Sequence, residues 1–271
     1  MAFDPKVFSQ IVFQGIYESK RIFNRMNRAY DALVAGVWAK SVDVPLMPQL
    51  VVSKAAVAEG HADRKRGSDV STVNVPFSTY IVPIACVLED IMATNDQLLN
   101  ALAAQVVAAF ERGLDVDSLA AAVLALPGGN KDIMAGGTMQ DVDIMKVLSW
   151  FNKKELPDTD RLVIVPTNLE EEFYACPMVK QAMSYNQNLL ETGVIKIKNA
   201  TFIVTALASQ VDNKDALQAI WGQSIAAVVK NSGLDRFEAY VAGSGLKVVD
   251  YAGYGGAKRI YDNGVFALKH Q

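Results

Sequence analysis

Residues 96–113 read DQLLNALAAQVVAAFERG, and this stretch decides the fold class because it is the clearest helix of the chain. Thr94 and Gln97 match the capping box, in which two otherwise unpaired N–H groups of the first turn are satisfied. Gly113 is expected to end the helix, since glycine commonly follows the last turn. The apolar positions recur at three- and four-residue steps and are Leu99, Leu102, Ala103, Val106, Val107 and Phe110.

The residues before this helix predict a long β-hairpin that begins at Leu50. Val70–Val75 alternates in polarity and Tyr80–Val87 is apolar, as expected of strands, and the two limbs flank a polar tip that contains Gly60 and Gly67. Because little apolar material lies near the tip, we expect the tip to project from the body. Its charged residues are Glu59, Arg64, Lys65, Arg66 and Asp69.

The chain before the hairpin predicts an N-terminal arm. Apolar residues from Asp4 to Leu33 approximate helical spacing, and Pro45 and Pro48 then lead into extended chain. The arm carries a basic cluster, which is either a contact surface or a solvated helix face. The cluster consists of Lys20, Arg21, Arg25 and Arg28.

The chain after Gly113 predicts two further helices and then strands, so the fold class is α+β. One helix is expected over Asp117–Leu126 and another over Thr138–Lys153, with Val142, Met145 and Leu148 on its apolar side. A helix capped by Thr167 or Asn168 should follow a buried strand and carry Glu170–Glu172 in its first turn. The expected strands are Arg161–Pro166, Val194–Lys198, Thr201–Thr205, Phe237–Val241, Leu246–Tyr251 and Ala257–Tyr261, with a turn at Asn263-Gly264.

The composition favours an oligomer without membrane spans. Of the 271 residues, 51% are hydrophobic and 20% are charged, and the net charge is −3. No apolar run reaches the ~18 residues that span a bilayer, so the apolar excess is expected between subunits. A basic nucleic-acid reader is excluded because it needs a cationic surplus. Cys86 and Cys176 lack a CxxC partner and are expected to be buried free thiols of a cytoplasmic chain without a signal peptide.

One weak enzymatic pattern is present. Gly222–Ala226 approximates the nucleophile elbow G-x-S-x-G around Ser224, and Asp235, Asp250 and His270 follow in hydrolase order. The second glycine is missing, and the only downstream histidine is the penultimate residue, where a chain end frays. A serine hydrolase is therefore the least favoured reading.

No cofactor or metal site is predicted. Two dispersed histidines and two cysteines cannot form a structural zinc site. There is no P-loop, and Gly253, Gly255 and Gly256 are expected between strands and not before a helix, so no dinucleotide site is supported. The tryptophans are expected in the core; they are Trp38, Trp150 and Trp221.

The order of arm, hairpin, long helix, central mixed domain and β-rich end resembles one family over nearly the whole chain. This family is the major capsid proteins of tailed double-stranded-DNA phages, the Hong Kong 97-type capsid fold. Residues 96–112 look like its spine helix, and Pro157–Pro166 looks like the turn, arginine and strand that open its axial domain. Gly193–Val204 is similar to its axial hairpin, with Asn199 in place of the turn glycine. Tyr251–Arg259 followed by Val265–Leu268 looks like its closing strands.

The resemblance implies a division of the chain into four parts. Residues 1–49 would form the N-terminal arm and residues 50–79 the extended hairpin, or E-loop. A peripheral domain would comprise residues 80–130 and 245–271, and an axial domain residues 131–244.

The resemblance also implies a non-enzymatic shell protein that assembles into hexamers and pentamers around packaged double-stranded DNA. Its implied partners are further copies of itself, scaffolding and portal proteins, and in some shells a decoration protein. Arg64, Lys65 and Arg66 would then dock on an acidic patch of the next subunit, and the basic cluster of the arm would contact a neighbour or the DNA. The alternative within the same fold is an encapsulin-like shell that encloses a cargo enzyme.

Overall fold

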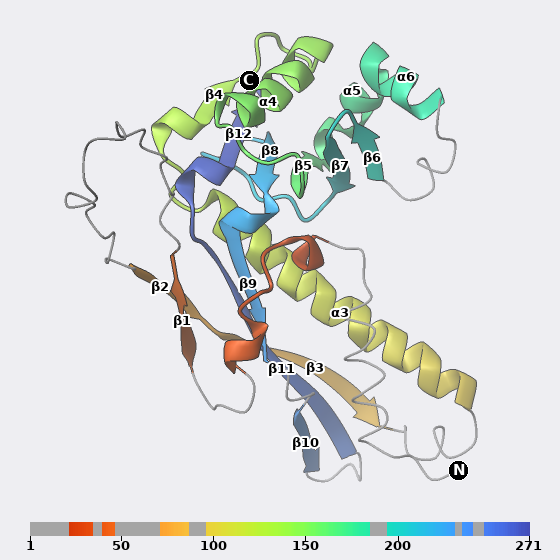
Figure 1. The fold of residues 1–271 in the computed structure, drawn as a ribbon. Helices are drawn as coiled ribbons and strands as arrows, with labels where there is room; N and C mark the ends of the chain where they lie inside the picture. The colour runs from red at the N-terminus through yellow and green to blue at the C-terminus, as the bar shows by residue number, and fades with distance from the viewer. Residues whose placement is uncertain are drawn as a thin grey trace, which may run out of the picture.

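The computed structural model describes residues 22–34, 40–46, 71–86, 96–184, 194–230, 235–240 and 247–271. In Figure 1 these residues form an upper part, built on one sheet and covered by short helices, and a lower part, in which one long helix lies against a second sheet. The helices are α3 (Asp96–Val123), α4 (Asp141–Lys153), α5 (Glu170–Ala175) and α6 (Pro177–Ser184). None of the described helices is both long and apolar enough to cross a membrane.

The upper part is built on a mixed six-stranded sheet with the order β4-β12-β8-β5-β7-β6. Its β4–β12 and β5–β7 pairs are parallel, and the other pairs are antiparallel. Phe173 of α5 stacks on Phe202 at 5.5 Å between ring centroids, and Phe151 of α4 is fully buried. The strands are β4 (Lys131–Ile133), β5 (Arg161–Pro166), β6 (Val194–Ile197), β7 (Ala200–Thr205), β8 (Ala216–Trp221) and β12 (Val265–Lys269).

The lower part is built on β11 (Lys247–Arg259), which pairs with β3 (Ser78–Cys86), β10 (Asp235–Tyr240) and β9 (Ile225–Val229). α3 packs against this sheet and buries Phe110 and Leu114 in the same core as Tyr251. Short 3₁₀ turns connect the two parts: η4 (Gly128–Asn130), η6 (Gly222–Ser224) and η7 (Asp262–Gly264).

The long helix does not end at Gly113, as the sequence predicted, but continues to Val123. Residues 117–126 are therefore mostly the second half of α3 and not a separate helix. Gly113 is needed for packing: a Cβ there would lie 2.8 Å from the Tyr80 ring. Burial, together with the hydrogen bond that the Tyr80 hydroxyl donates to Asp117, raises the pKa of Tyr80 far above its usual value. The glycine thus admits an aromatic ring to the helix surface.

The two expected tail strands 246–251 and 257–261 are one continuous strand, β11. The prediction that Gly253, Gly255 and Gly256 lie between strands is wrong, because all three lie within β11. A Cβ on Gly256 would lie 2.1 Å from the carbonyl oxygen of Pro76, and one on Gly255 would lie 3.1 Å from that of Val228. Glycine inside a strand commonly marks such a close backbone approach.

The first limb of the hairpin begins earlier than Leu50. β1 (Ser41–Pro45) pairs antiparallel with β2 (Thr72–Pro76) in a two-stranded sheet, so pairing starts within the residues assigned to the arm.

The strand groups also differ from the expected domain division. β12 belongs to the upper sheet, whereas β9 and β10 belong to the lower one. The physical reason is that each of the η6 and η7 turns passes the chain from one sheet to the other.

Two smaller expectations also met a different outcome. Thr167 and Asn168 do not cap α5, since its N-cap is Leu169 and the Asn168 amide donates to Asp215 at 2.9 Å. In the β6–β7 turn the left-handed residue is Lys198, with φ 53°, and not Asn199. The capping box expected at Thr94 lies outside the described residues, as does Trp38. Strand β5, in contrast, has the bounds predicted from the sequence, and all its residues are buried.

We expect Gly256→Ala to destabilise the chain by about 1–3 kcal/mol, because the new methyl group would force β11 away from Pro76. The measurement is urea-induced unfolding followed by circular dichroism. Gly137→Ala is the matched control, since a Cβ at that position would meet no atom within 4 Å. Equal unfolding midpoints for the two variants would contradict the close approach.

Candidate functional site

The predicted contact residues fall into two groups. The hairpin-tip residues Glu59, Arg64, Lys65, Arg66 and Asp69 lie outside the described residues, as do Lys20 and Arg21 of the arm. Arg25 and Arg28 lie in residues 22–34, which we call the N-terminal strap; it contains η1 (Phe23–Arg25) and η2 (Asp31–Val34).

Arg28 makes contacts within its own chain. Its guanidinium donates to Asp31 Oδ2 at 2.7 and 3.0 Å and to the Asn24 side chain, and it lies 5.1 Å from the centroid of the Phe23 ring. The Arg28 side chain is 14% exposed. Arg28 therefore stabilises the fold of the strap, a role that the sequence pattern did not predict.

The N-terminal strap lies between α3 and β9. The Phe23 N–H donates to the buried carboxylate of Asp115 on α3 at 2.8 Å. On the other side, the Asn27 N–H donates to the carbonyls of Gly222 and Ile225 at 3.1 and 3.0 Å. A Cβ on Gly222 would lie 2.2 Å from the Arg25 carbonyl oxygen, so this position requires glycine. The strap thus holds the long helix to the edge of the lower sheet.

The base of the hairpin is fixed to the body of the chain. Val44 and Val75, one from each limb, are fully buried in a small core with Ala226 and Ile260. Lys258 of β11 also donates to the Asn74 carbonyl at 2.9 Å. These contacts hold β1 and β2 against the end of β11 and the start of β9.

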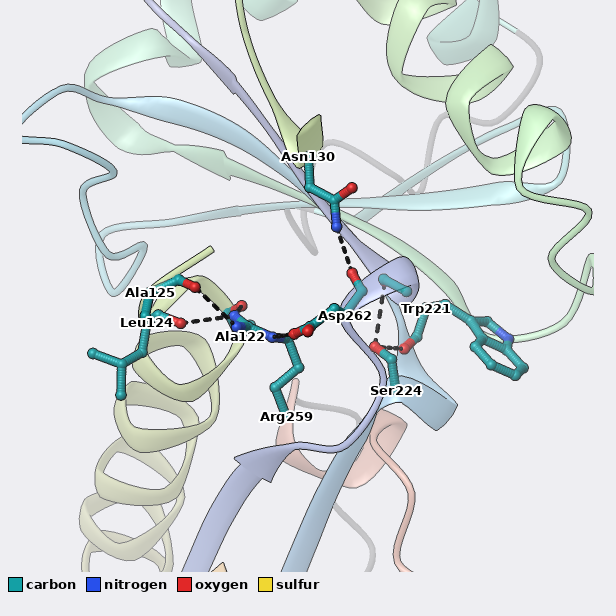
Figure 2. A network of polar contacts seen from close by, with 9 residues as sticks. Ala122, Leu124, Ala125, Asn130, Trp221, Ser224, Arg259 and Asp262 are labelled. Carbon is teal, nitrogen blue, oxygen red and sulfur yellow. Dashed lines mark hydrogen bonds and ion pairs between the residues drawn. The ribbon is translucent and has the colours of Figure 1, made fainter. Parts of the chain in front are cut away.

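The junction between the two parts is centred on Arg259, the last residue of β11 (Figure 2). Its guanidinium donates to the carbonyls of Ala122 and Leu124 at 2.8 Å each, and to that of Ala125 at 3.2 Å. The last carbonyls of a helix have no partner within the helix, and a cation there is favoured by the helix dipole. Arg259 therefore caps α3, whose chain then turns through the left-handed residue Ala125, with φ 48°.

The same arginine orders the turn that leads into the upper sheet. Its Nε donates to Asp262 Oδ1 at 2.8 Å, and the Asp262 carbonyl accepts a hydrogen bond from the Asn130 amide at 2.6 Å. η4 and η7 are thereby tied to each other and to the end of α3 (Figure 2). The connections between the two parts are thus joined to one another by side chains.

Ser224 belongs to this junction. It is fully buried, and its hydroxyl donates to the Trp221 carbonyl at 2.6 Å, with the Gly264 carbonyl oxygen 3.3 Å away (Figure 2). His270 instead faces Glu172 at 3.5 Å between Nε2 and Oε2. Ser224 and His270 thus have separate partners, and the geometry of a nucleophile with its base is not formed.

Other polar groups of the upper part serve packing. Glu172, one of the three acidic residues in the first turn of α5, accepts a hydrogen bond from the Met139 N–H at 2.6 Å. This carboxylate therefore has a structural partner. Burial raises the pKa of the Cys176 thiol, as do the nearby carboxylates, and Cys176 is a free buried cysteine as expected. No group of acids, histidines and cysteines that could hold a metal occurs among the described residues.

Sequence reasoning missed two features. Arg259 gives no local signal because its helix partners lie more than a hundred positions away, at 122–125. On α4, Leu148 is buried as predicted, but Val142 and Met145 were wrongly placed on the apolar side and are exposed. Hydrophobic spacing alone did not separate the buried face from the exposed one.

Comparisons of sequence identify no relative of this chain. No family model matches it, and no curated protein does. Comparison of structures, in contrast, finds many matches among shell proteins.

The structural matches define the fold as that of capsid and encapsulin proteins. The satellite phage P4 procapsid matches with a TM-score of 0.57 and 10% identity, over 100% of this chain and 92% of that chain. The capsid of Ralstonia phage GP4 matches with a TM-score of 0.56 and 11% identity, over 94% and 89%. The SrpI encapsulin complex of Synechococcus elongatus matches with a TM-score of 0.55 and 10% identity, over 100% and 96%.

We expect Arg259→Met to destabilise the chain by about 1–3 kcal/mol, because the carbonyls at the end of α3 lose their donors. Arg259→Lys should recover part of the loss, since it restores charge without the planar fork. The measurement is the urea midpoint. Arg112→Met, an exposed change on the same helix, is the control and should shift the midpoint little. Equal midpoints for Arg259→Met and Arg112→Met would rule out the capping role.

Proposed function

We propose that the chain is the major capsid protein of a tailed phage, which assembles into hexamers and pentamers of an icosahedral head around double-stranded DNA. The observation that carries this proposal is the match to capsid structures over nearly the whole of both chains. On this proposal, the described order of the β1–β2 pair, α3 and the mixed sheet would be that of the Hong Kong 97-type fold. The described geometry supports a structural role, since the one catalytic pattern of the sequence is used for packing.

The proposal assigns three parts of the chain to shell functions. The extended hairpin that reaches the next subunit, expected over residues 50–79, would begin at β1 and end at β2, with its base held by β11. The lower part with α3 would be the peripheral domain, and the upper part the axial domain. Strand β12 is then better assigned to the axial domain, and β9 and β10 to the peripheral domain.

The proposed partners follow from this role. Copies of the chain contact one another, and scaffolding, portal and decoration proteins are the further partners of a phage head. The subunit would reside in the host cytoplasm before assembly and in the virion afterwards. DNA contact would be non-specific, as the near-neutral composition has no cationic surplus.

An encapsulin-like compartment is the second candidate function. It is favoured by the match to the SrpI encapsulin complex, which covers the whole of this chain. The content of purified particles discriminates between the two: packaged genomic DNA supports the virion and an enclosed enzyme supports the compartment.

We expect the purified recombinant chain to form closed shells, tubes or ring-shaped capsomers. Negative-stain electron microscopy and light scattering measure this directly. A monodisperse particle of 29.4 kDa at every concentration and salt condition, also after co-expression with its scaffold, would contradict the proposal.

We expect the triple variant Arg64→Glu, Lys65→Glu, Arg66→Glu to fold but not to close shells, because the tip would repel an acidic patch on the next subunit. Assembly is measured by sedimentation velocity and folding by circular dichroism. The double variant Lys153→Glu, Lys180→Glu, which reverses two exposed charges elsewhere, is the control. Normal particles from the triple variant would show that the tip is a solvated loop.

A further inference from the structure

The lower sheet has two faces, and α3 packs against one of them. Successive side chains of a strand point to opposite faces. A Cβ on Gly255 would meet Leu114 of α3, whereas a Cβ on Gly256 would meet Pro76 of β2. The base of the hairpin therefore lies across β11 from α3 (Figure 1). We call the side of the sheet that carries the hairpin base its outer face.

The outer face continues beyond the hairpin base toward the start of β11. Asp250 and Ala252 precede Gly256 by even numbers of residues, so their side chains lie on this face. Ile81 of β3 pairs directly with Ala252 and shares its face. Ile81 is 59% exposed, and Thr79, two residues earlier, is also exposed. An exposed aliphatic side chain thus lies close to a carboxylate, and we call Ile81 and Asp250 the outer-face site.

Asp250 has a carboxylate oxygen without a donor. Its Oδ1 atom is shielded from water and has no hydrogen-bond partner in the described part of the chain. Asp262, in contrast, accepts a hydrogen bond from Arg259 at 2.8 Å. A carboxylate oxygen that is removed from water without a donor costs free energy of folding, and a donor from a partner would offset this cost. Asp250 as a whole is only half-buried, so a partner can approach it.

The spacing of the outer-face site fits one long cationic side chain. Ile81 pairs with Ala252, and Pro83 pairs with Asp250, so Ile81 and Asp250 are diagonal neighbours in the ladder. Diagonal positions are about 7–8 Å apart, within reach of a long side chain. An arginine or lysine can lay its aliphatic stem on Ile81 and donate from its charged end to the carboxylate. An anionic nucleic acid would be repelled by this carboxylate, so the chemistry fits a basic protein segment.

The chain itself carries a segment of this kind. Arg64-Lys65-Arg66 is the longest run of consecutive cations in the sequence, and it lies at the predicted tip of the hairpin. In the shorter run Lys258-Arg259, both side chains already donate within the chain. Charge complementarity therefore favours the hairpin tip as the occupant of the outer-face site.

The first residues of the hairpin lead away from the outer-face site of their own chain. Pro76, at the base, lies beside Gly256, whereas Asn74, two residues nearer the tip, accepts a hydrogen bond from Lys258 at 2.9 Å. A step toward the tip thus follows β11 from residue 256 toward residue 258, and so away from Asp250. Because the hairpin starts out in this direction, the tip that fits the outer-face site is that of a second copy.

We propose that Ile81 and Asp250 receive the hairpin tip of a neighbouring copy, with Asp250 accepting hydrogen bonds from a cation of Arg64–Arg66 and Ile81 packing against the stem of that side chain. This inference rests on the proposed function, in which the tip contacts an acidic patch of the next subunit. It adds the residues that receive the tip.

The first test is Asp250→Asn, which removes the charge and keeps the shape of the side chain. The thermal midpoint of the isolated subunit should stay equal or rise, because an unpartnered carboxylate is lost. The concentration of half-assembly in sedimentation velocity should rise about tenfold or more, because the charged donor of the tip loses its acceptor. Glu171→Gln is the matched control, since it removes the same charge from an exposed position on α5, and it should assemble like the wild type.

The second test reverses the charges. Asp250→Lys should block the closure of shells, as is expected of the triple variant Arg64→Glu, Lys65→Glu, Arg66→Glu. The combination of both changes places a cation opposite three anions and should restore assembly. The combination of the triple variant with Glu171→Lys has the same net charge and should not restore it. Circular dichroism checks that each variant is folded.

The outcomes separate the inference from the proposed function. If the wild type and Asp250→Asn assemble equally well, the inference fails and the capsid function stands. A lower thermal midpoint for Asp250→Asn would show that Asp250 has a partner within its own chain and would also overturn the inference. The same holds if Glu171→Lys rescues the triple variant as well as Asp250→Lys does. If the wild type does not assemble under any condition, both the inference and the proposed function are overturned.

Discussion

The described structure depends on the capping of α3 by Arg259. The end of a helix of 28 residues carries unpaired carbonyls, and here they accept hydrogen bonds from a residue of the long strand of the lower sheet. The same guanidinium binds Asp262, at the start of the path into β12. This one side chain therefore links α3, the lower sheet and the turn that leads into the upper sheet. The N-terminal strap and the hairpin base bind to the helix and the sheet that Arg259 holds together.

The sequence predicted those elements whose signal is local. β5 is a short apolar run with an arginine before it and a proline at its end, and it occurs with its predicted bounds. The roles of the glycines were predicted wrongly because glycine can end a helix, form a turn or leave space for a neighbouring group. Gly113 leaves space for Tyr80 and Gly256 leaves space for Pro76, and both neighbours are remote in the chain.

The roles of individual side chains were less predictable than the fold. Arg259 has no local pattern, since its partners become neighbours only after folding. Val142 fits helical apolar spacing, yet it is exposed, because α4 lies on the sheet through Ile144, Val147 and Phe151. Periodicity shows that a helix has an apolar side, but which residues face the sheet is decided by how the helix lies on it.

The connections between the two sheets have a mechanical consequence. The chain crosses from the lower part to the upper part after α3, returns through η6 into β9, and crosses again through η7 into β12. These crossings are separate covalent connections between the same two parts, and Asn130 and Arg259 link them to one another (Figure 2). A tensile force that pulls the two parts in opposite directions is consequently shared among several covalent segments. On the capsid function proposed above, these segments together would carry the load of internal pressure.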